Sequence, residues 1–392
     1  MRIAVIIAEY NPFHPGHAYQ LREARRLSGA DCVAVVMSSC FTQRGEAAMF
    51  APAVRARMAL EQGADIVFAL PACWAVRDAE HFALGGVRLL QLLGADAISF
   101  GAENADPSLL LRTARLMENP DALGDGIRAA ADTGLSYPAA LSKALREADT
   151  QLGAVLDSPN NTLAVCYLRA MLRLSCAMEV CPVKRIGSGY HDTAVVSVPS
   201  ATAVRGLLER GDWHTLRSLY PPEASASLRR EALEGRLHRA AALDQALLYR
   251  LRTMTDAEWH ALPDLSEGIE DRLRKALACA STREELLQSA KTKRYPYARL
   301  SRLCAHALLG LTAQQLDSEP LPDALWLLGF RNSARPLLSD LKKRGVNVIS
   351  KASAADSDRA WFRTELLAYD LWTLGCLLPT DLGLRQGVVH IE

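Results

Sequence analysis

The stretch that most constrains the fold is residues 3–20, IAVIIAEYNPFHPGHAYQ. Its apolar start, Ile3–Ala8, is typical of a strand buried inside a parallel sheet. A short turn follows, and Pro15 and Gly16 then open a helix that we expect to run to about Leu27. Unpaired N–H groups and the positive end of the dipole at such a helix N-terminus attract anions. The sequence therefore predicts a phosphate site after the first strand, where Gly16 lets a phosphate approach the backbone closely.

Two histidines lie at this predicted site. His14 and His17 are three positions apart, so both imidazoles can donate to one phosphate. A solvated surface pair is the alternative, but the strand before the pattern and the helix after it favour phosphate binding. The pattern His-x-Gly-His after a first strand is similar to the signature of the nucleotidyltransferase superfamily. That similarity implies that His14 and His17 bind a triphosphate and stabilise charge while its α-phosphate is attacked.

A second segment, Ser200–Arg205 (SATAVR), is similar to the other signature of that superfamily, Ser/Thr-x-Ser/Thr-x-x-Arg. Ser200 is a good helix N-cap, so we expect a helix to start there. Thr202 and Arg205 then lie in its first turns, where a hydroxyl and a guanidinium can reach the β- and γ-phosphates. An ordinary capped helix with an exposed arginine is the alternative, and it is less favoured when both signatures occur in order.

Short apolar runs alternate with helical segments over the first hundred residues. This pattern predicts an α/β, Rossmann-like domain with a parallel sheet over residues 1–220. The two signatures imply by resemblance that it is a nucleotidyltransferase domain. We expect its strands at Ile3–Ala8, Cys32–Met37, Asp65–Leu70, Ala97–Phe100 and Val183–Ser188. Leu/Ala/Arg/Glu-rich segments dominate from about residue 223, so we expect a mostly α-helical region over residues 221–392.

Composition narrows the class of protein. Net charge is +1 over 392 residues, so any nucleic-acid contact has to come from a local patch. The nine cysteines form no C-x-x-C pair, which argues against a zinc knuckle, and we predict no metal-ligating residues. Without a signal peptide or a long apolar segment, we expect a cytoplasmic protein with no membrane contact.

Residues 291–302 form the densest basic and aromatic stretch, with five cations and two tyrosines. Such a stretch can grip an RNA backbone and stack a base, so we predict RNA binding by Lys291, Lys293, Arg294 and Tyr295. The alternative is a solvated helix start. Lys342–Arg344 is a weaker candidate, for which we favour a solvated helix end.

Many rarer segments together resemble one family, the bacterial tRNA(Met) cytidine acetate ligases. The resemblance runs from residue 1 to about 310 and rests on residues 8–17, Met37–Ser38, Phe41, Gln43–Glu46, Phe100–Glu103, Pro159–Asn161, Leu163, Tyr167, Arg185–Ile186, Tyr190–Asp192, Ser200–Thr202, Arg205 and Lys291–Tyr295. Two departures stand out: Ser39–Cys40 replaces a Gly-Asn pair, and Ala47 stands where a proline is usual. They put the exact shape of this loop in doubt, but not its Gln43-Arg44-Gly45 core.

The resemblance implies a two-step reaction. Acetate and ATP give acetyl-adenylate and pyrophosphate, and the acetyl group then passes to N4 of the wobble cytidine of elongator tRNA(Met). Mg²⁺ is expected with ATP. The implied catalytic residues are His14, His17 and Arg205. The implied ATP contacts are Ile7, Ala8, Glu9, Tyr10, Asn11, Pro12, Phe13, His14, Pro15, Gly16, His17, Gln20, Gly101, Asn160, Asn161, Arg185, Ile186, Ser200 and Thr202.

Other functions stay open at this point. A small-molecule adenylyltransferase would carry the same two signatures, although the basic and aromatic stretch would then be unexplained. An RNA-binding protein with a regulatory nucleotide site is a second alternative, which intact His14, His17 and Arg205 disfavour. A class I aminoacyl-tRNA synthetase is disfavoured because the sequence has no Lys-Met-Ser-Lys-Ser loop.

Overall fold

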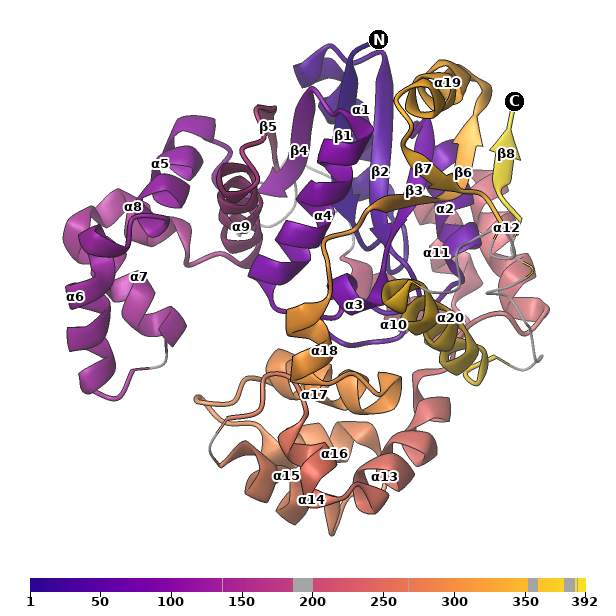
Figure 1. The fold of residues 1–392 in the computed structure, drawn as a ribbon. Helices are drawn as coiled ribbons and strands as arrows, with labels where there is room; N and C mark the ends of the chain where they lie inside the picture. Colours follow the sequence, from indigo (N-terminus) through magenta and orange to yellow (C-terminus); the bar gives the residue numbers. More distant parts are fainter. Residues whose placement is uncertain (136, 186–199, 267, 352–358, 377–384, 386) are drawn as a thin grey trace.

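The computed structural model describes the chain except residues 136, 186–199, 267, 352–358, 377–384 and 386. Within the described part, eight strands form one sheet in the order β5-β4-β1-β2-β3-β6-β7, with β8 paired to β6 (Figure 1). The first five strands are parallel, and β6 runs antiparallel to β3. Their bounds are β1 Ile3–Ala8, β2 Cys32–Ser38, β3 Ile66–Leu70, β4 Ala97–Ala102, β5 Glu179–Lys184, β6 Ala324–Arg331, β7 Asn347–Ile349 and β8 Val389–Ile391.

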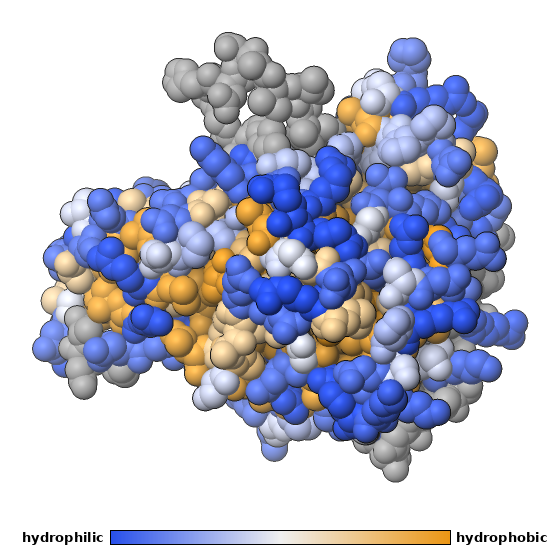
Figure 2. Space-filling view, turned by 90° about the horizontal axis from the view of Figure 1, so that it is seen from above, coloured by the Kyte–Doolittle hydropathy of each residue, from blue (hydrophilic) through white to orange (hydrophobic). Residues whose placement is uncertain are grey.

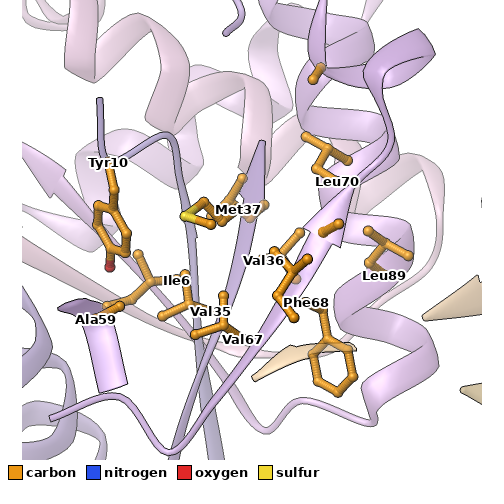
Figure 3. Close-up of a cluster of buried hydrophobic side chains, with 14 of the residues drawn as sticks. Ile6, Tyr10, Val35, Val36, Met37, Ala59, Val67, Phe68, Leu70 and Leu89 are labelled. Atoms are coloured by element: carbon orange, nitrogen blue, oxygen red, sulfur yellow. The ribbon is translucent and has the colours of Figure 1, made fainter. Parts of the chain in front are cut away.

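Helices cover both faces of the sheet, as the predicted α/β class requires. Right-handed crossovers place α1 (Pro15–Ser28) and α2 (Pro52–Glu61) on one face, and α4 (Ala79–Leu93) and α9 (Pro159–Arg173) on the other. Ala59 of α2 and Leu89 of α4 lie on opposite sides of β2 and β3 (Figure 3). All residues of β2 and β3 are buried, which explains their uninterrupted apolar sequences.

The fifth strand was misplaced in the sequence prediction. It covers Glu179–Lys184 rather than Val183–Ser188, and the second half of the expected strand, residues 186–188, lies outside the described residues. Pro182 sits inside the strand, opposite Phe100. A proline is tolerated here because β5 is at the edge of the sheet, where one side of the strand needs no hydrogen-bond partner.

The mostly helical region expected over residues 221–392 also contains three strands in its last part. β6, β7 and β8 return to the sheet, and residues 324–329 of β6 are buried. The sheet therefore includes the C-terminal part of the chain. A short helix, α3 Ala72–Ala75, follows β3. Further helices lie between β5 and β8: α10 Ala201–Arg210, α11 Trp213–Leu219, α12 Pro222–Leu233, α18 Ala313–Ser318, α19 Arg335–Lys343 and α20 Ala360–Thr373.

Residues 244–309 form a helical domain with a hydrophobic core of its own. Its helices are α13 Asp244–Thr253, α14 Asp256–His260, α15 Ile269–Leu277, α16 Arg283–Ala290 and α17 Tyr297–Leu309. Trp259, Leu286 and Leu303 are fully buried in that core. The domain lies against the carboxyl ends of the central strands (Figure 1), where the His306 Nε2 is 2.6 Å from the Val76 carbonyl oxygen.

Residues 107–155 form a helical lobe beside α9, near the β5 edge of the sheet (Figure 1). It comprises α5 Pro107–Met117, α6 Pro120–Asp132, α7 Tyr137–Ala148 and α8 Thr150–Val155, with a small core around Leu123 and Leu145. Apolar residues gather over this lobe on the face seen in Figure 2. Of the helices that the structure describes, none has the length and apolar character needed to cross a membrane.

Candidate nucleotide site

The order of strands locates the site. Chain order reverses at β1, which has β2 on one side and β4 on the other. In open parallel sheets, ligands bind outside the carboxyl ends of the strands at such a point. The segment that follows β1, residues 9–17, is called the phosphate turn below. It lies beside the ends of β2 and β4, which carry residues 39–47 and 103–104.

His14 and His17 hold each other at the start of α1. His14 is the N-cap, and its Nδ1 accepts a hydrogen bond from the Gly16 N–H at 3.1 Å. The His17 Nδ1 accepts from the His14 N–H at 3.1 Å, and the two rings stack with centroids 3.7 Å apart. Because each Nδ1 is an acceptor, each ring carries its proton on Nε2. Both imidazoles are therefore fixed as Nε2–H donors.

Both imidazoles are neutral near pH 7. Burial, with a smaller effect of Arg185, lowers the pKa of His14 to about 4. Burial, then His14 and Arg185, lowers the pKa of His17 well below its usual value. The histidines can thus offer hydrogen bonds to a phosphate, while the positive charge at this place comes from arginines.

The second signature lies beside the first. Arg205 of α10 donates from Nη1 to the Asn11 carbonyl at 2.8 Å and from Nη2 to the Thr202 hydroxyl at 3.1 Å. Ser200 is the N-cap of α10, as predicted, and its hydroxyl accepts from the Ala203 N–H at 3.2 Å. The structure therefore brings Arg205 and Thr202 to the phosphate turn and leaves Ser200 to cap the helix.

The end of β4 is shaped by the start of α9. The Asn161 Oδ1 accepts from the N–H groups of Glu103 at 2.9 Å and Asn104 at 3.2 Å, and the Asn160 amide donates to the Glu103 Oε1 at 2.5 Å. Asn161 is buried, so it positions the loop after β4. A Cβ at Gly101 would lie 3.6 Å from the Arg185 Cγ, which shows that the Arg185 side chain covers this glycine.

Several predicted ATP contacts have buried side chains. Tyr10 and Phe13 are 1% exposed, and the Tyr10 ring points toward Ile6 and Ala59 (Figure 3). The predicted residues Ile7, Asn11 and Pro12 are buried as well, whereas Ala8, Glu9, Pro15, Gly16 and Gln20 are partly exposed. A nucleotide can meet the buried positions only through their backbone atoms. Ile186 lies outside the described residues.

The sequence analysis missed Arg55, which is fully buried in α2. Its guanidinium donates to the carbonyls of Glu9 at 2.6 Å, Ser38 at 3.0 Å and Phe50 at 3.0 Å, and also to that of Ser39. Burial lowers its pKa to about 10. Arg55 thereby ties the end of β1 to the end of β2. The one available signal was its position three and four residues before apolar Met58 and Ala59, on the buried face of the helix.

The basic stretch is only partly available to a partner. Lys291, Lys293 and Arg294 are exposed between α16 and α17. Tyr295 is 7% exposed within the core of the helical domain, so little of its ring is available for stacking on a base. Lys342 and Lys343 are exposed in the last turn of α19, in agreement with a solvated helix end.

No cluster of three or more His, Cys, Asp or Glu side chains placed to hold a metal ion occurs among the residues that the structure describes. The N–H groups of His14, Gly16 and His17 are already bonded within the turn. The donors at the turn that can meet a ligand include the two Nε2–H groups and the guanidinium of Arg205. Such a set is suited to a polyphosphate.

A parallel sheet with a His-x-Gly-His helix start at its switch point, and a Thr/Arg helix beside it, defines a nucleotidyl transferase. A family model described as HIGH Nucleotidyl Transferase matches residues 1–378. The tRNA(Met) cytidine acetate ligase of Geobacillus sp. strain WCH70 is 36% identical over 91% of each chain, and that of Acetivibrio thermocellus is 34% identical over 95% of each. The chain therefore belongs to the tRNA(Met) cytidine acetate ligases, within the HIGH nucleotidyl transferase family.

A solved structure agrees with this assignment. The crystal structure of Thermotoga maritima TmcAL bound with alpha-thio ATP is 26% identical to this chain, and each covers 100% of the other with a TM-score of 0.90. The α/β fold expected from the sequence is thus confirmed.

Proposed function

We propose that this protein activates acetate with ATP and transfers the acetyl group to N4 of the wobble cytidine of elongator tRNA(Met). The observation that carries the proposal is the meeting of His14, His17 and Arg205 at the switch point of the sheet, in a member of this family. An ATP analogue is bound by the related Thermotoga maritima protein, which supports ATP as the nucleotide.

In the first step an acetate oxygen attacks the α-phosphate. A carboxylate oxygen–phosphorus bond forms, the bond from that phosphorus to the oxygen bridging to the β-phosphate breaks, and pyrophosphate leaves. Charge accumulates on phosphate oxygens, where His14 and His17 donate from Nε2 and Arg205 contributes its guanidinium. Mg²⁺ is proposed to enter with ATP and to neutralise phosphate charge. The protein thus contributes position and charge.

In the second step the cytidine amine attacks the acetyl carbonyl carbon. A carbon–nitrogen bond forms, the carbon–oxygen bond to AMP breaks, and the amine loses a proton. We propose that exposed Lys291, Lys293 and Arg294 of the helical domain contact the tRNA backbone. We also propose that the protein is cytoplasmic, because its proposed substrate is tRNA.

The test is incubation of the protein with ATP, labelled acetate and total bacterial tRNA, followed by nucleoside analysis. Label in N4-acetylcytidine that requires ATP and does not require acetyl-CoA is the expected result. Pyrophosphate release from ATP and acetate, with no label in tRNA, would keep the acyl-adenylate step and remove the proposed acceptor. If neither product forms, the proposal is contradicted.

A further inference from the structure

The loop after β2 contacts both the phosphate turn and the helical domain. We define loop 42–46 as Thr42-Gln43-Arg44-Gly45-Glu46. It is a tight turn, in which the Thr42 N–H donates to the Glu46 carbonyl at 2.8 Å and the Gly45 N–H to the Thr42 carbonyl at 2.9 Å. Gly45 has φ +74°, in the left-handed region. A turn of this kind has few ways to move without breaking its own hydrogen bonds.

One side of loop 42–46 is seated on the helical domain. A Cβ at Gly45 would lie 2.6 Å from the Ser301 carbonyl oxygen and 2.7 Å from the Arg302 Cα, so only glycine allows this contact. The buried Ser301 hydroxyl donates to the Arg44 carbonyl, and Arg283 of α16 donates both to that hydroxyl and, at 3.3 Å, to the Gly45 carbonyl. Two helices therefore fix the backbone of the loop.

The other side of loop 42–46 holds the phosphate turn. The Gln43 N–H donates to the Glu9 Oε1 at 2.5 Å, and the Gln43 side-chain amide donates to the Arg77 carbonyl at 2.8 Å. Burial raises the pKa of Glu9, and the Gln43 N–H and Arg44 oppose that rise. Glu9 lies two residues before Asn11, whose carbonyl accepts from Arg205. A shift of Gln43 would thus move the carboxylate at the first residue of the phosphate turn.

We propose that the helical domain positions the phosphate turn through loop 42–46, with Ser301 and Arg283 as positioning residues for ATP binding. The chain of contacts runs from Arg283 to Ser301, to the Arg44 carbonyl, and from Gln43 to Glu9. The sequence analysis did not predict that Arg283 or Ser301, in the helical domain, affects nucleotide binding. The inference rests on the proposed function for the identity of ATP, and it adds a second role to a domain proposed for RNA.

The test compares two glycines of similar backbone conformation in the full-length protein. Gly45→Ala strains a residue at φ +74° and also clashes with α17, whereas Gly345→Ala strains a residue at φ +71° with nothing within 4 Å of the added carbon. ATP binding is measured by titration calorimetry with MgATP, and KM and kcat by pyrophosphate release with acetate. We expect Gly45→Ala to weaken ATP binding and raise KM for ATP about tenfold, with a smaller change in kcat. Gly345→Ala should bind ATP like the unmodified protein.

Ser301→Ala keeps the proposal testable if Gly45→Ala does not fold. It removes only the hydroxyl that holds the Arg44 carbonyl, and we expect it to weaken ATP binding about threefold to tenfold. Unchanged ATP affinity in folded Gly45→Ala or Ser301→Ala would overturn the proposal, as would an equal loss in Gly345→Ala. An unmodified protein that binds no ATP would overturn it together with the proposed function. If the unmodified protein binds ATP but does not acetylate tRNA, the proposed function is wrong, and the role of loop 42–46 in ATP binding is still decided by the variants.

Discussion

Burial makes His14 and His17 hydrogen-bond donors without making them cations. Each Nδ1 is occupied by a backbone N–H, and desolvation lowers the pKa of both rings, to about 4 for His14. A neutral donor of fixed tautomer stabilises charge that develops on a phosphate oxygen, without the repulsion that two adjacent imidazolium ions would suffer. In the proposed mechanism these residues act through their Nε2–H groups.

Replacing either histidine should stop adenylate formation. We expect His14→Ala or His17→Ala to lower the rate of pyrophosphate release with acetate about a hundredfold or more, because a donor to the developing charge is lost. tRNA affinity in a filter-binding assay should be unchanged. Exposed His260, in the helical domain, offers a matched control, and His260→Ala should keep the rate. A normal rate in both active-site variants would remove them from the proposed mechanism.

Arg55 acts on stability as well as on the site. Arg55→Met leaves the carbonyls of Glu9, Ser38 and Phe50 buried without their donor. Each buried unsatisfied group costs about 1–3 kcal/mol, so we expect the free energy of unfolding in urea to fall by about 3–5 kcal/mol. Arg57→Met, two positions along the same helix and exposed, should change it by less than about 0.5 kcal/mol. Equal losses in the two variants would contradict this account of Arg55.

At the scale of elements, the sequence predicts helices and strands that follow from local patterns, but it misses the pairing of strands that are far apart in the chain. Strands β1 to β4 and helix α1 follow from local sequence patterns, and their bounds agree with the prediction within about two residues. The edge strand β5 was misplaced because Pro182 is compatible only with an edge, which no local pattern reveals. The return of β6 to β3 was missed because more than two hundred residues separate the two paired strands.

In the candidate site too, local features were predicted from the sequence and contacts between distant segments were not. The helix start at His14 and the N-cap at Ser200 were predicted, since each is a local pattern of a few residues. The meeting of Arg205 with the Asn11 carbonyl, across 194 positions, was expected only from the family signatures. Arg55 was missed, and the burial of Tyr295 was not foreseen, because sequence gives the charge or aromaticity of a side chain but not whether the fold buries it.

The contact between α9 and the loop after β4 can be tested separately. Asn161→Ala removes the acceptor for two backbone N–H groups, so the loop should loosen and ATP affinity should fall about tenfold in a calorimetric titration. Asn161→Asp keeps an acceptor oxygen at the same place and should hold the loop. ATP affinity that is unchanged in Asn161→Ala would mean that the order of this loop does not affect the nucleotide.

At the scale of the whole molecule, a net charge of +1 means that RNA affinity must be local. We expect Lys293→Glu combined with Arg294→Glu to weaken tRNA binding at low salt and to reduce the slope of log affinity against log salt by about two. Lys342→Glu combined with Lys343→Glu makes the same charge change at exposed residues of α19. tRNA affinity that falls equally in both double variants would indicate a general charge effect and contradict an RNA surface at residues 291–294.

Buried histidines also set how the stability of the molecule responds to acid. Burial lowers the pKa of His238 to about 4, and that of His306 likewise, against 6.5 in an unfolded chain. Between these values the unfolded chain binds protons that the native protein does not, so stability is complete above about pH 6.5 and falls as pH drops toward 4. Glu365 acts in the opposite sense, because burial raises its pKa to about 7 and the native state then holds a proton that the unfolded chain lacks.

Four histidines have lowered pKa values in the native state, His14, His17, His238 and His306, and they oppose the acids whose pKa burial raises, chiefly Glu365 together with Glu9. We therefore expect the free energy of unfolding to decrease from pH 7 to pH 5. His238→Phe keeps a ring beside Trp372 but removes the titrating group, so its decrease should be smaller by about 2 kcal/mol, which is 1.5 pH units at about 1.4 kcal/mol each. His260→Phe, at an exposed position, should decrease like the unmodified protein. Urea unfolding at the two pH values gives these differences, and equal slopes in His238→Phe and the unmodified protein would mean that the native state protonates His238 as readily as the unfolded chain does.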